Sequence, residues 1–211
     1  MAPEITGPIV QAAVATIRDH AEELTALDQA IGDGDHGLNM KRGFDAVAEG
    51  LGGLAGLPLS EALQKVGMTL VMKVGGASGP LYGSLFMAMG KAVAGDPARL
   101  DQVAAMLAEG VAAVKKRGKS DAGEKTMLDV LVPVNEALHE AAGRPVALAT
   151  LVSDLRKAAD TGLERTRNMQ ATKGRASFLR ERSVGHLDPG ARSSQLLVHA
   201  VCGVVEGLGK S

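Results

Sequence analysis

Apolar residues recur along this chain at the three- and four-residue spacing of amphipathic helices. Val10, Val14 and Ile17 follow this spacing near the start of the sequence, and Leu197 and Val201 follow it near the end. Such spacing places the apolar side chains on one face of a helix. It predicts eight helices and no convincing strand, with the helices at residues 8–26, 37–50, 60–74, 80–94, 99–117, 126–142, 148–170 and 191–208.

Four polar segments occur at every second connection between these helices. In an up-and-down bundle, every second connection lies at the same end, so these segments would come together. We therefore expect an all-α fold, an antiparallel bundle of eight helices with a binding site at one end. A chain of 211 residues is expected to form one domain, which would span residues 1–211. The four segments are residues 28–39, 75–80, 118–126 and 175–190.

Composition supports helices and argues against two classes of partner. The chain has three Phe, one Tyr and no Trp, whereas strands are usually rich in aromatic residues. A net charge of −1 and so few aromatics argue against nucleic-acid binding. The first seven residues lack a basic signal-peptide region, and no apolar run reaches the roughly 20 residues of a membrane span. We therefore expect a cytoplasmic protein without membrane attachment.

The most informative stretch is residues 28–39, which read DQAIGDGDHGLN. It combines three carboxylates, a His and an Asn with three glycines, so it cannot be buried without a cationic partner. Clustered carboxylates on a flexible loop suit Mg²⁺, which completes its coordination with water and substrate phosphates. Asp28, Asp33 and Asp35 are therefore the candidate metal ligands and would act in catalysis through the metal.

Two known motifs match this loop only superficially. Its glycines form G-x-G-x-x-G, but helical residues precede them, and two carboxylates would repel the pyrophosphate of a dinucleotide. Counted from Asp33 as a Ca²⁺ loop, the fifth and twelfth positions are Gly37 and Phe44, where oxygen ligands are needed. For the loop taken alone, a solvated acidic turn between two helices stays an alternative.

A second candidate segment is Gly75-Gly76-Ala77-Ser78-Gly79-Pro80, between two predicted helices. Free N–H groups at a helix start attract anions, so a phosphate could lie here with a hydrogen bond from Ser78. We expect Pro80 at the first helical position. Taken alone, the segment is more readily explained as a tight turn between two helices.

Two further segments complete the predicted site. Residues 118–126 resemble a phosphate-binding P-loop, but no strand precedes them and Glu124 separates Gly123 from Lys125, so we expect a mobile lid or docking loop instead. Residues 173–190 form a long connector in which Arg175 is a candidate catalytic cation. Exposed charges at residues 119–125 and 180–182 are the predicted rim for docking a partner.

Several of these segments together resemble the nucleotide-binding L subunit of bacterial dihydroxyacetone kinase. The similarity runs from about residue 9 to 209, in order and at compatible spacing. It is carried by Leu27-Asp28-x-x-Ile31-Gly32-Asp33-x-Asp35-His36-Gly37-x-Asn39-Met40, Gly75-Gly76-Ala77-Ser78-Gly79-Pro80, Lys125-Thr126-Met127-x-Asp129, Lys173-Gly174-Arg175-Ala176-Ser177 and Gly185-His186-x-Asp188-Pro189-Gly190.

The resemblance implies an eight-helix antiparallel barrel with the nucleotide, ADP or ATP, at one end. It implies that Asp28, Asp33 and Asp35 hold two Mg²⁺ ions that bridge the nucleotide phosphates. The nucleotide pocket that it implies is formed by His36, Gly37, Leu38, Asn39, Ala77, Ser78, Gly118, Met127, Arg175, Asp188, Pro189 and Gly190.

The resemblance also implies partners. In the family, dihydroxyacetone is held covalently by a His of a separate K subunit, and a phosphotransferase-system M subunit phosphorylates the bound ADP. A transcription regulator is a further possible partner, and the chain could form a homodimer. Relatives are also fused to ATP-dependent kinases in which ATP exchanges freely, but a free-standing chain favours the phosphotransferase version. A metal-dependent phosphoester hydrolase and a non-enzymatic nucleotide sensor are the competing hypotheses.

Overall fold

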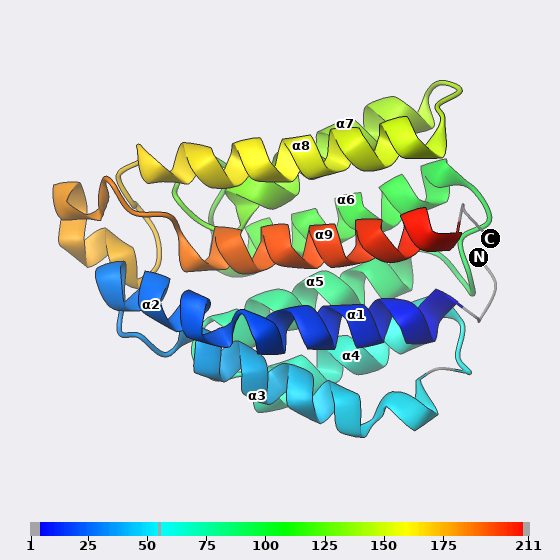
Figure 1. The fold of residues 1–211 in the computed structure, drawn as a ribbon, viewed down its shortest axis with the longest axis horizontal. Coiled ribbons are helices and arrows are strands. Elements are labelled where there is room, and N and C mark those ends of the chain that lie inside the picture. The colour runs from blue at the N-terminus through cyan, green and yellow to red at the C-terminus, as the bar shows by residue number, and fades with distance from the viewer. Residues whose placement is uncertain (1–4, 55, 209–211) are drawn as a thin grey trace.

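The computed structural model describes residues 5–54 and 56–208, and every regular element in these ranges is helical (Figure 1). Residues 1–4, which belong to the N-terminal stretch where no signal peptide is expected, lie outside the described part. The α-helices are α1 (Thr6–Asp19), α2 (Ala21–Ile31), α3 (His36–Glu49), α4 (Leu59–Lys73), α5 (Ser78–Ala92), α6 (Leu100–Gly118), α7 (Leu128–Ala142), α8 (Leu148–Arg167) and α9 (Pro189–Leu208). Two 3-10 helices, η2 (Leu51–Gly53) and η3 (Arg175–Ser183), lie between them.

The helices pack in a cyclic order. Each helix from α3 to α9 contacts the one before it, and α9 packs back against α1. From α3 onwards, consecutive helices run in alternating directions along the long axis (Figure 1). The predicted all-α antiparallel fold is therefore confirmed.

The number of helices differs from the prediction, because residues 8–26 do not form one helix. The chain leaves helical geometry at His20, where φ is −108° and ψ is 11°. The His20 ring nitrogen Nδ1 donates to the carbonyl of Thr16 at 2.9 Å, which satisfies one of the acceptors at the end of α1. The second helix, α2, then continues to Ile31, so Asp28 lies on its last turn and not in a loop.

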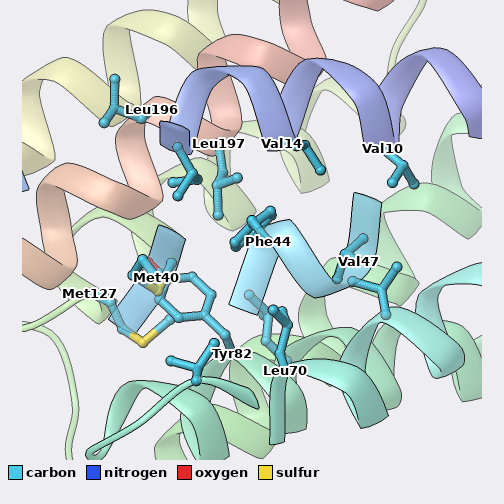
Figure 2. Packing of buried hydrophobic residues seen from close by; sticks show 14 of the residues in the cluster. Val10, Val14, Met40, Phe44, Val47, Leu70, Tyr82, Met127, Leu196 and Leu197 are labelled. Carbon is cyan, nitrogen blue, oxygen red and sulfur yellow. The ribbon is translucent and has the colours of Figure 1, made fainter. Parts of the chain in front are cut away.

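The main hydrophobic core lies inside the ring of helices (Figure 2). Val14 from α1, Phe44 from α3, Leu70 from α4 and Tyr82 from α5 are all buried there. Helices α4 and α5 approach closely because glycines face each other, and a Cβ added to Gly67 would lie 2.8 Å from a carbonyl oxygen of α5. Close packing of this kind fixes the helix ends that carry the polar segments.

The four polar segments gather at one end of the molecule, as the bundle topology predicts (Figure 1). This end holds the loop between α2 and α3, the loop between α4 and α5, the loop between α6 and α7, and the connector from α8 to α9. The connector is partly ordered as η3, which the sequence pattern does not predict. Among the described residues, no helix combines the length and apolarity that crossing a membrane requires.

Candidate functional site

The three aspartates of the first polar segment converge at this end of the molecule. Ligand oxygens of Asp28, Asp33 and Asp35 all lie within 4.8 Å of one another. Oxygen atoms bound on opposite sides of one Mg²⁺ are about 4.2 Å apart, because each Mg–O bond is about 2.1 Å long. The cluster therefore has the donor type and nearly the spacing that Mg²⁺ requires.

Asp28 also fixes the local backbone. Its Oδ2 atom accepts hydrogen bonds from the backbone N–H groups of Asp35 at 2.9 Å and His36 at 3.1 Å, so it caps the start of α3. The turn itself requires Gly34, whose φ of +75° lies in the left-handed region that side chains disfavour. One carboxylate thus ties the end of α2 to the start of α3 and sets the positions of the other two.

Arg175 reaches this cluster from the α8–α9 connector. Its Nη2 atom lies 3.0 Å from Oδ2 of Asp33, although its side chain is 68% exposed. An exposed ion pair of this kind contributes little to stability. Its guanidinium is therefore available to a phosphate, which Arg can bind through two parallel hydrogen bonds.

The segment before α5 adds an anion-attracting backbone. Helix α5 begins at Ser78, two residues before the predicted start, so Pro80 occupies the third helical position. The first N–H groups of a helix have no partner within it, and the helix dipole favours negative charge there. Gly76 provides the required turn with a φ of +64°.

A buried polar network lies beneath this helix start. The His36 ring bonds to the Ser78 hydroxyl at 3.0 Å through Nδ1 and to the Ser193 hydroxyl at 2.9 Å through Nε2. The Tyr82 hydroxyl lies 2.7 Å from that of Ser193 and 2.9 Å from that of Ser194. The network links α3, α5 and α9, so the position of Ser78 depends on all three helices.

Burial sets the protonation of this network. It lowers the pKa of His36, although the negative charges of Asp28 and Asp35 act in the opposite direction. Burial also raises the pKa of Tyr82 to about 12, so Tyr82 stays neutral. A neutral imidazole has one donor and one acceptor nitrogen, which can bond to one hydroxyl on each side.

Asp188 forms the opposite part of the site. Its Oδ2 atom accepts the backbone N–H of Ala191 at 2.7 Å and caps α9. Burial raises the pKa of Asp188 to about 7; the Ala191 hydrogen bond and the Lys125 ammonium oppose this shift, while the charges of Asp129 and Asp28 add to it. The carboxyl is therefore placed to change its charge near neutral pH.

The loop between α6 and α7, expected to be a mobile lid or docking loop, is held in its second half by hydrogen bonds to Asp129. The Asp129 carboxylate accepts the backbone N–H groups of Gly123 at 2.5 Å and Thr126 at 2.7 Å. Lys125, expected on an exposed docking rim, is only 1% exposed. This lysine belongs to a segment that carries the family resemblance, but nothing in the sequence indicates that it is buried.

These elements enclose a cavity of about 590 Å³, a typical size for a small-molecule site. Most of the residues that the sequence singled out line this cavity, and three do not. The predicted residues that line it are Asp28, Asp33, Asp35, His36, Ala77, Ser78, Gly118, Met127, Arg175, Asp188, Pro189 and Gly190.

The three residues outside the cavity lining lie at the start of α3. A Cβ at Gly37 would lie 1.9 Å from the carbonyl oxygen of Ala21, so this glycine permits close packing of α3 on α2. Leu38 is 64% exposed. Asn39 accepts a hydrogen bond from Arg42 at 2.9 Å, beside the loop that contains Gly75.

Three cationic residues of the lining, Arg117, Lys125 and Lys173, were not predicted as site residues from the sequence. Arg117 and Lys173 directly precede Gly118 and Gly174, which belong to the predicted polar segments. A cation next to a glycine in a polar segment was the available signal.

The cavity is surrounded by an acidic cluster, the unpaired N–H groups at the start of α5, and cationic side chains. These features are typical of a helical protein that binds phosphate and metal at one end of the bundle. Comparison with known proteins gives the family. The DAK2 domain matches residues 30–203. The chain belongs to this family and, within it, to the group of dihydroxyacetone kinase ADP-binding subunits called DhaL.

Two curated relatives illustrate the similarity. The ADP-binding subunit DhaL of PEP-dependent dihydroxyacetone kinase 1 from Listeria innocua is 46% identical over 185 residues, which cover 88% of each chain. The corresponding Escherichia coli subunit is 43% identical, over 84% of this chain and 85% of that one.

A solved structure shares the fold. The dihydroxyacetone kinase from C. freundii, in complex with AMP-PNP and Mg²⁺, is similar with a TM-score of 0.74 and 28% sequence identity. The match covers 96% of this chain but only 34% of that kinase. The present chain thus spans about a third of the length of that kinase.

Proposed function

We propose that this chain is the ADP- and Mg²⁺-binding subunit of a dihydroxyacetone kinase. In this role it receives a phosphoryl group from a phosphotransferase-system M subunit on its bound ADP. It then passes the group to dihydroxyacetone held on a K subunit. The names of the relatives, which describe ADP-binding subunits of PEP-dependent and PTS-dependent kinases, support this proposal.

The observation that carries the proposal is the acidic cluster beside the start of α5. Asp28, Asp33 and Asp35 would hold two Mg²⁺ ions, and the N–H groups and hydroxyl at Ser78 would bind phosphate oxygens. Bound Mg²⁺ would neutralise phosphate charge during transfer. Arg175 would add positive charge on the open side, since its contact with Asp33 is exposed and can be exchanged.

The remaining lining residues would hold the nucleotide itself. Gly118 and Met127 contribute to one wall of the cavity, and Asp188, Pro189 and Gly190 contribute to another. Asn39, which lies beside Gly75 of the lining, and the exposed Leu38 would contact the nucleotide from the start of α3. Gly37 would act through packing, because its Cα faces α2.

A second proposal, an ATP-dependent kinase subunit with freely exchanging ATP, is favoured by the structural relative. The C. freundii kinase was solved with AMP-PNP, a nucleoside triphosphate analogue, and Mg²⁺. The two proposals differ in the phosphoryl donor and in how tightly ADP is retained.

The test is to purify the chain without added nucleotide, denature it, and quantify any released nucleotide by chromatography. About one ADP per chain, retained through dialysis with Mg²⁺, is the expected result for a subunit that is phosphorylated in place. An empty site that binds and exchanges ATP would support the second proposal. A chain with no affinity for either nucleotide would contradict both.

A further inference from the structure

Lys125 is a charged side chain that the proposed chemistry does not use. It is 1% exposed, and its ammonium group contacts four backbone carbonyl oxygens. These belong to Thr166 at 2.8 Å, Met169 at 3.2 Å, Ser183 at 2.7 Å and His186 at 2.5 Å. An ammonium group has three N–H donors, so all of its donor capacity is used within the protein.

The four carbonyl groups come from segments that would otherwise be separate. Thr166 belongs to the last turn of α8, Met169 follows that helix, Ser183 ends η3, and His186 lies just before α9. Four carbonyl oxygens directed at one point repel each other and need a cation between them. Burial lowers the pKa of Lys125, while the negative charges of Asp188 and Asp129 act in the opposite direction.

Lys125 itself belongs to a different wall of the cavity. Its backbone has a left-handed φ of 61°, and the adjacent Asp129 hydrogen bonds hold the loop between α6 and α7 in place. Lys125 and the next two residues, Thr126 and Met127, line the cavity. The connector supplies three of the four carbonyls and carries Arg175 and Asp188.

We propose that Lys125 is a positioning residue that joins these two walls and holds Arg175 and Asp188 in the geometry that binds the nucleotide. The proposal rests on the proposed function, since it concerns the same site. Lys125 lines the cavity, but its three donors are used by carbonyl oxygens of α8 and the connector, so in this arrangement it would not bind the phosphates itself. It acts as an internal cation in a carbonyl cage.

The proposal has a reciprocal consequence. If the closed cage favours nucleotide binding, then bound nucleotide must favour the closed cage by the same factor. Nucleotide should therefore protect Lys125 from chemical modification, and loss of Lys125 should weaken nucleotide binding. If Lys125 only stabilised the fold, nucleotide would protect it no more than it protects other buried residues, and loss of Lys125 would not weaken nucleotide binding in a folded chain.

The first experiment measures Mg–ADP affinity of Lys125→Ala by calorimetry, after removal of any retained nucleotide. We expect a loss of about tenfold or more, a typical size for coupling between sites. Propylammonium, which restores the missing methylenes and donors, should recover part of the affinity. Tetramethylammonium, which has the charge but no N–H donor, should not.

The matched control is Lys116→Ala, an exposed lysine on α6 that does not line the cavity. It should bind Mg–ADP as the wild type does, and propylammonium should leave wild-type affinity unchanged. If Lys125→Ala bound Mg–ADP with wild-type affinity, the positioning role of Lys125 would be overturned, while the proposed function would stand. A wild-type chain that binds no Mg–ADP would instead overturn the proposed function on which it rests.

The second experiment uses the wild-type chain and decides the matter even if Lys125→Ala does not fold. Lysine acylation is followed by mass spectrometry with and without Mg–ADP, and alkylation of buried Cys202 on α9 reports global opening. We expect Mg–ADP to slow acylation of Lys125 about tenfold more than alkylation of Cys202, with Lys116 unaffected. Equal protection of Lys125 and Cys202, or none, would overturn the proposal.

Discussion

Asp33 and Asp35 are the exposed members of the acidic cluster, so their substitution tests metal binding with little effect on folding. Asp33→Asn and Asp35→Asn each remove a ligand charge while keeping the size of the side chain. We expect Mg²⁺-dependent ADP binding to fall below detection in both variants, because hard divalent cations depend on carboxylate charge. Calorimetric titration of ADP in Mg²⁺ and in EDTA measures this.

The control for this prediction is Asp45→Asn. Asp45 is also a surface carboxylate, but it pairs with Arg18 and Lys41 on α1 and α3, away from the cavity. It should bind Mg–ADP normally. If the Asp33 and Asp35 variants bound Mg–ADP as the wild type does, these aspartates would not be the Mg²⁺ ligands that the proposed function requires.

The buried Asp188 carboxyl makes stability depend on pH in a defined direction. Its pKa is about 7 in the folded protein, against 3.8 for the ordinary side chain, because burial disfavours the charged form. Between about pH 4 and pH 7 the folded state therefore binds a proton that the unfolded chain has released. The contribution of this group to the free energy of unfolding must fall as the pH rises through that window.

Asp188→Asn isolates this contribution, since the amide keeps an oxygen to accept the Ala191 N–H but does not titrate. Urea denaturation of both proteins in EDTA at pH 5, 6 and 7 gives their free energies of unfolding. The wild-type value minus the variant value should decrease steadily with pH. A difference that is constant or increases would show that the carboxyl is ionised throughout.

At the scale of helices, the contact between α2 and α3 sets the geometry of the metal site. A Cβ on Gly37 would lie 1.9 Å from the Ala21 carbonyl oxygen and 2.4 Å from Oγ1 of Thr25. Gly37→Ala should therefore force α3 away from α2, with a loss of about 1–3 kcal/mol or more in the free energy of unfolding. Gly52→Ala in η2, where nothing lies within 4 Å of the added Cβ, is the control.

Urea denaturation compares the two variants with the wild type. Because α2 carries Asp28 and α3 begins at His36, the Gly37 variant should also bind Mg–ADP more weakly. A Gly37→Ala protein as stable as Gly52→Ala would mean that the helices can separate without cost.

Periodicity predicted the helices well, but it could not locate every break between them. The apolar pattern continues across His20, since Ala21 and Leu24 follow Ile17 at intervals of four and three residues. The break depends on backbone dihedrals and on one ring hydrogen bond to Thr16, and neither is encoded in apolar spacing. The same limit applies to η3, whose connector has little apolar pattern.

The site was predictable where residue chemistry was unusual and unpredictable where it depended on packing. The spacing of Asp28, Asp33 and Asp35 indicated a cluster, and the structure brings them together. Leu38 shares that motif but points outward, because consecutive residues of a helix face different directions. Lys125 looked like a surface cation, and only the fold shows that carbonyl groups enclose it.

At the scale of the whole molecule, the alternating helix directions place the polar segments that line the cavity at one end, where a second protein would have to approach (Figure 1). The segment η3 lies on the rim of this end, packed against α2. Leu179 anchors it beside Ile31 and Ala176. Its neighbour Phe178 is 84% exposed, and Arg180 and Arg182 are exposed as well.

This rim is the predicted docking surface for the K subunit. Lys125 is not part of it, because its side chain is buried. The double variant Arg180→Glu and Arg182→Glu should slow phosphoryl transfer to the K subunit about tenfold at low salt, since charge reversal acts mainly on association. The defect should shrink as ionic strength rises, because exposed charges are screened. Mg–ADP affinity should not change, because neither arginine lines the cavity.

The matched control is the double variant Lys91→Glu and Arg144→Glu, which makes the same charge change with exposed residues at the opposite end of the helices. It should transfer at the wild-type rate. Phe178→Ala tests the apolar part of the rim and should weaken transfer at every salt concentration, since apolar burial is not screened. If the arginine and control variants were equally active, the partner would have to approach the cavity from another side.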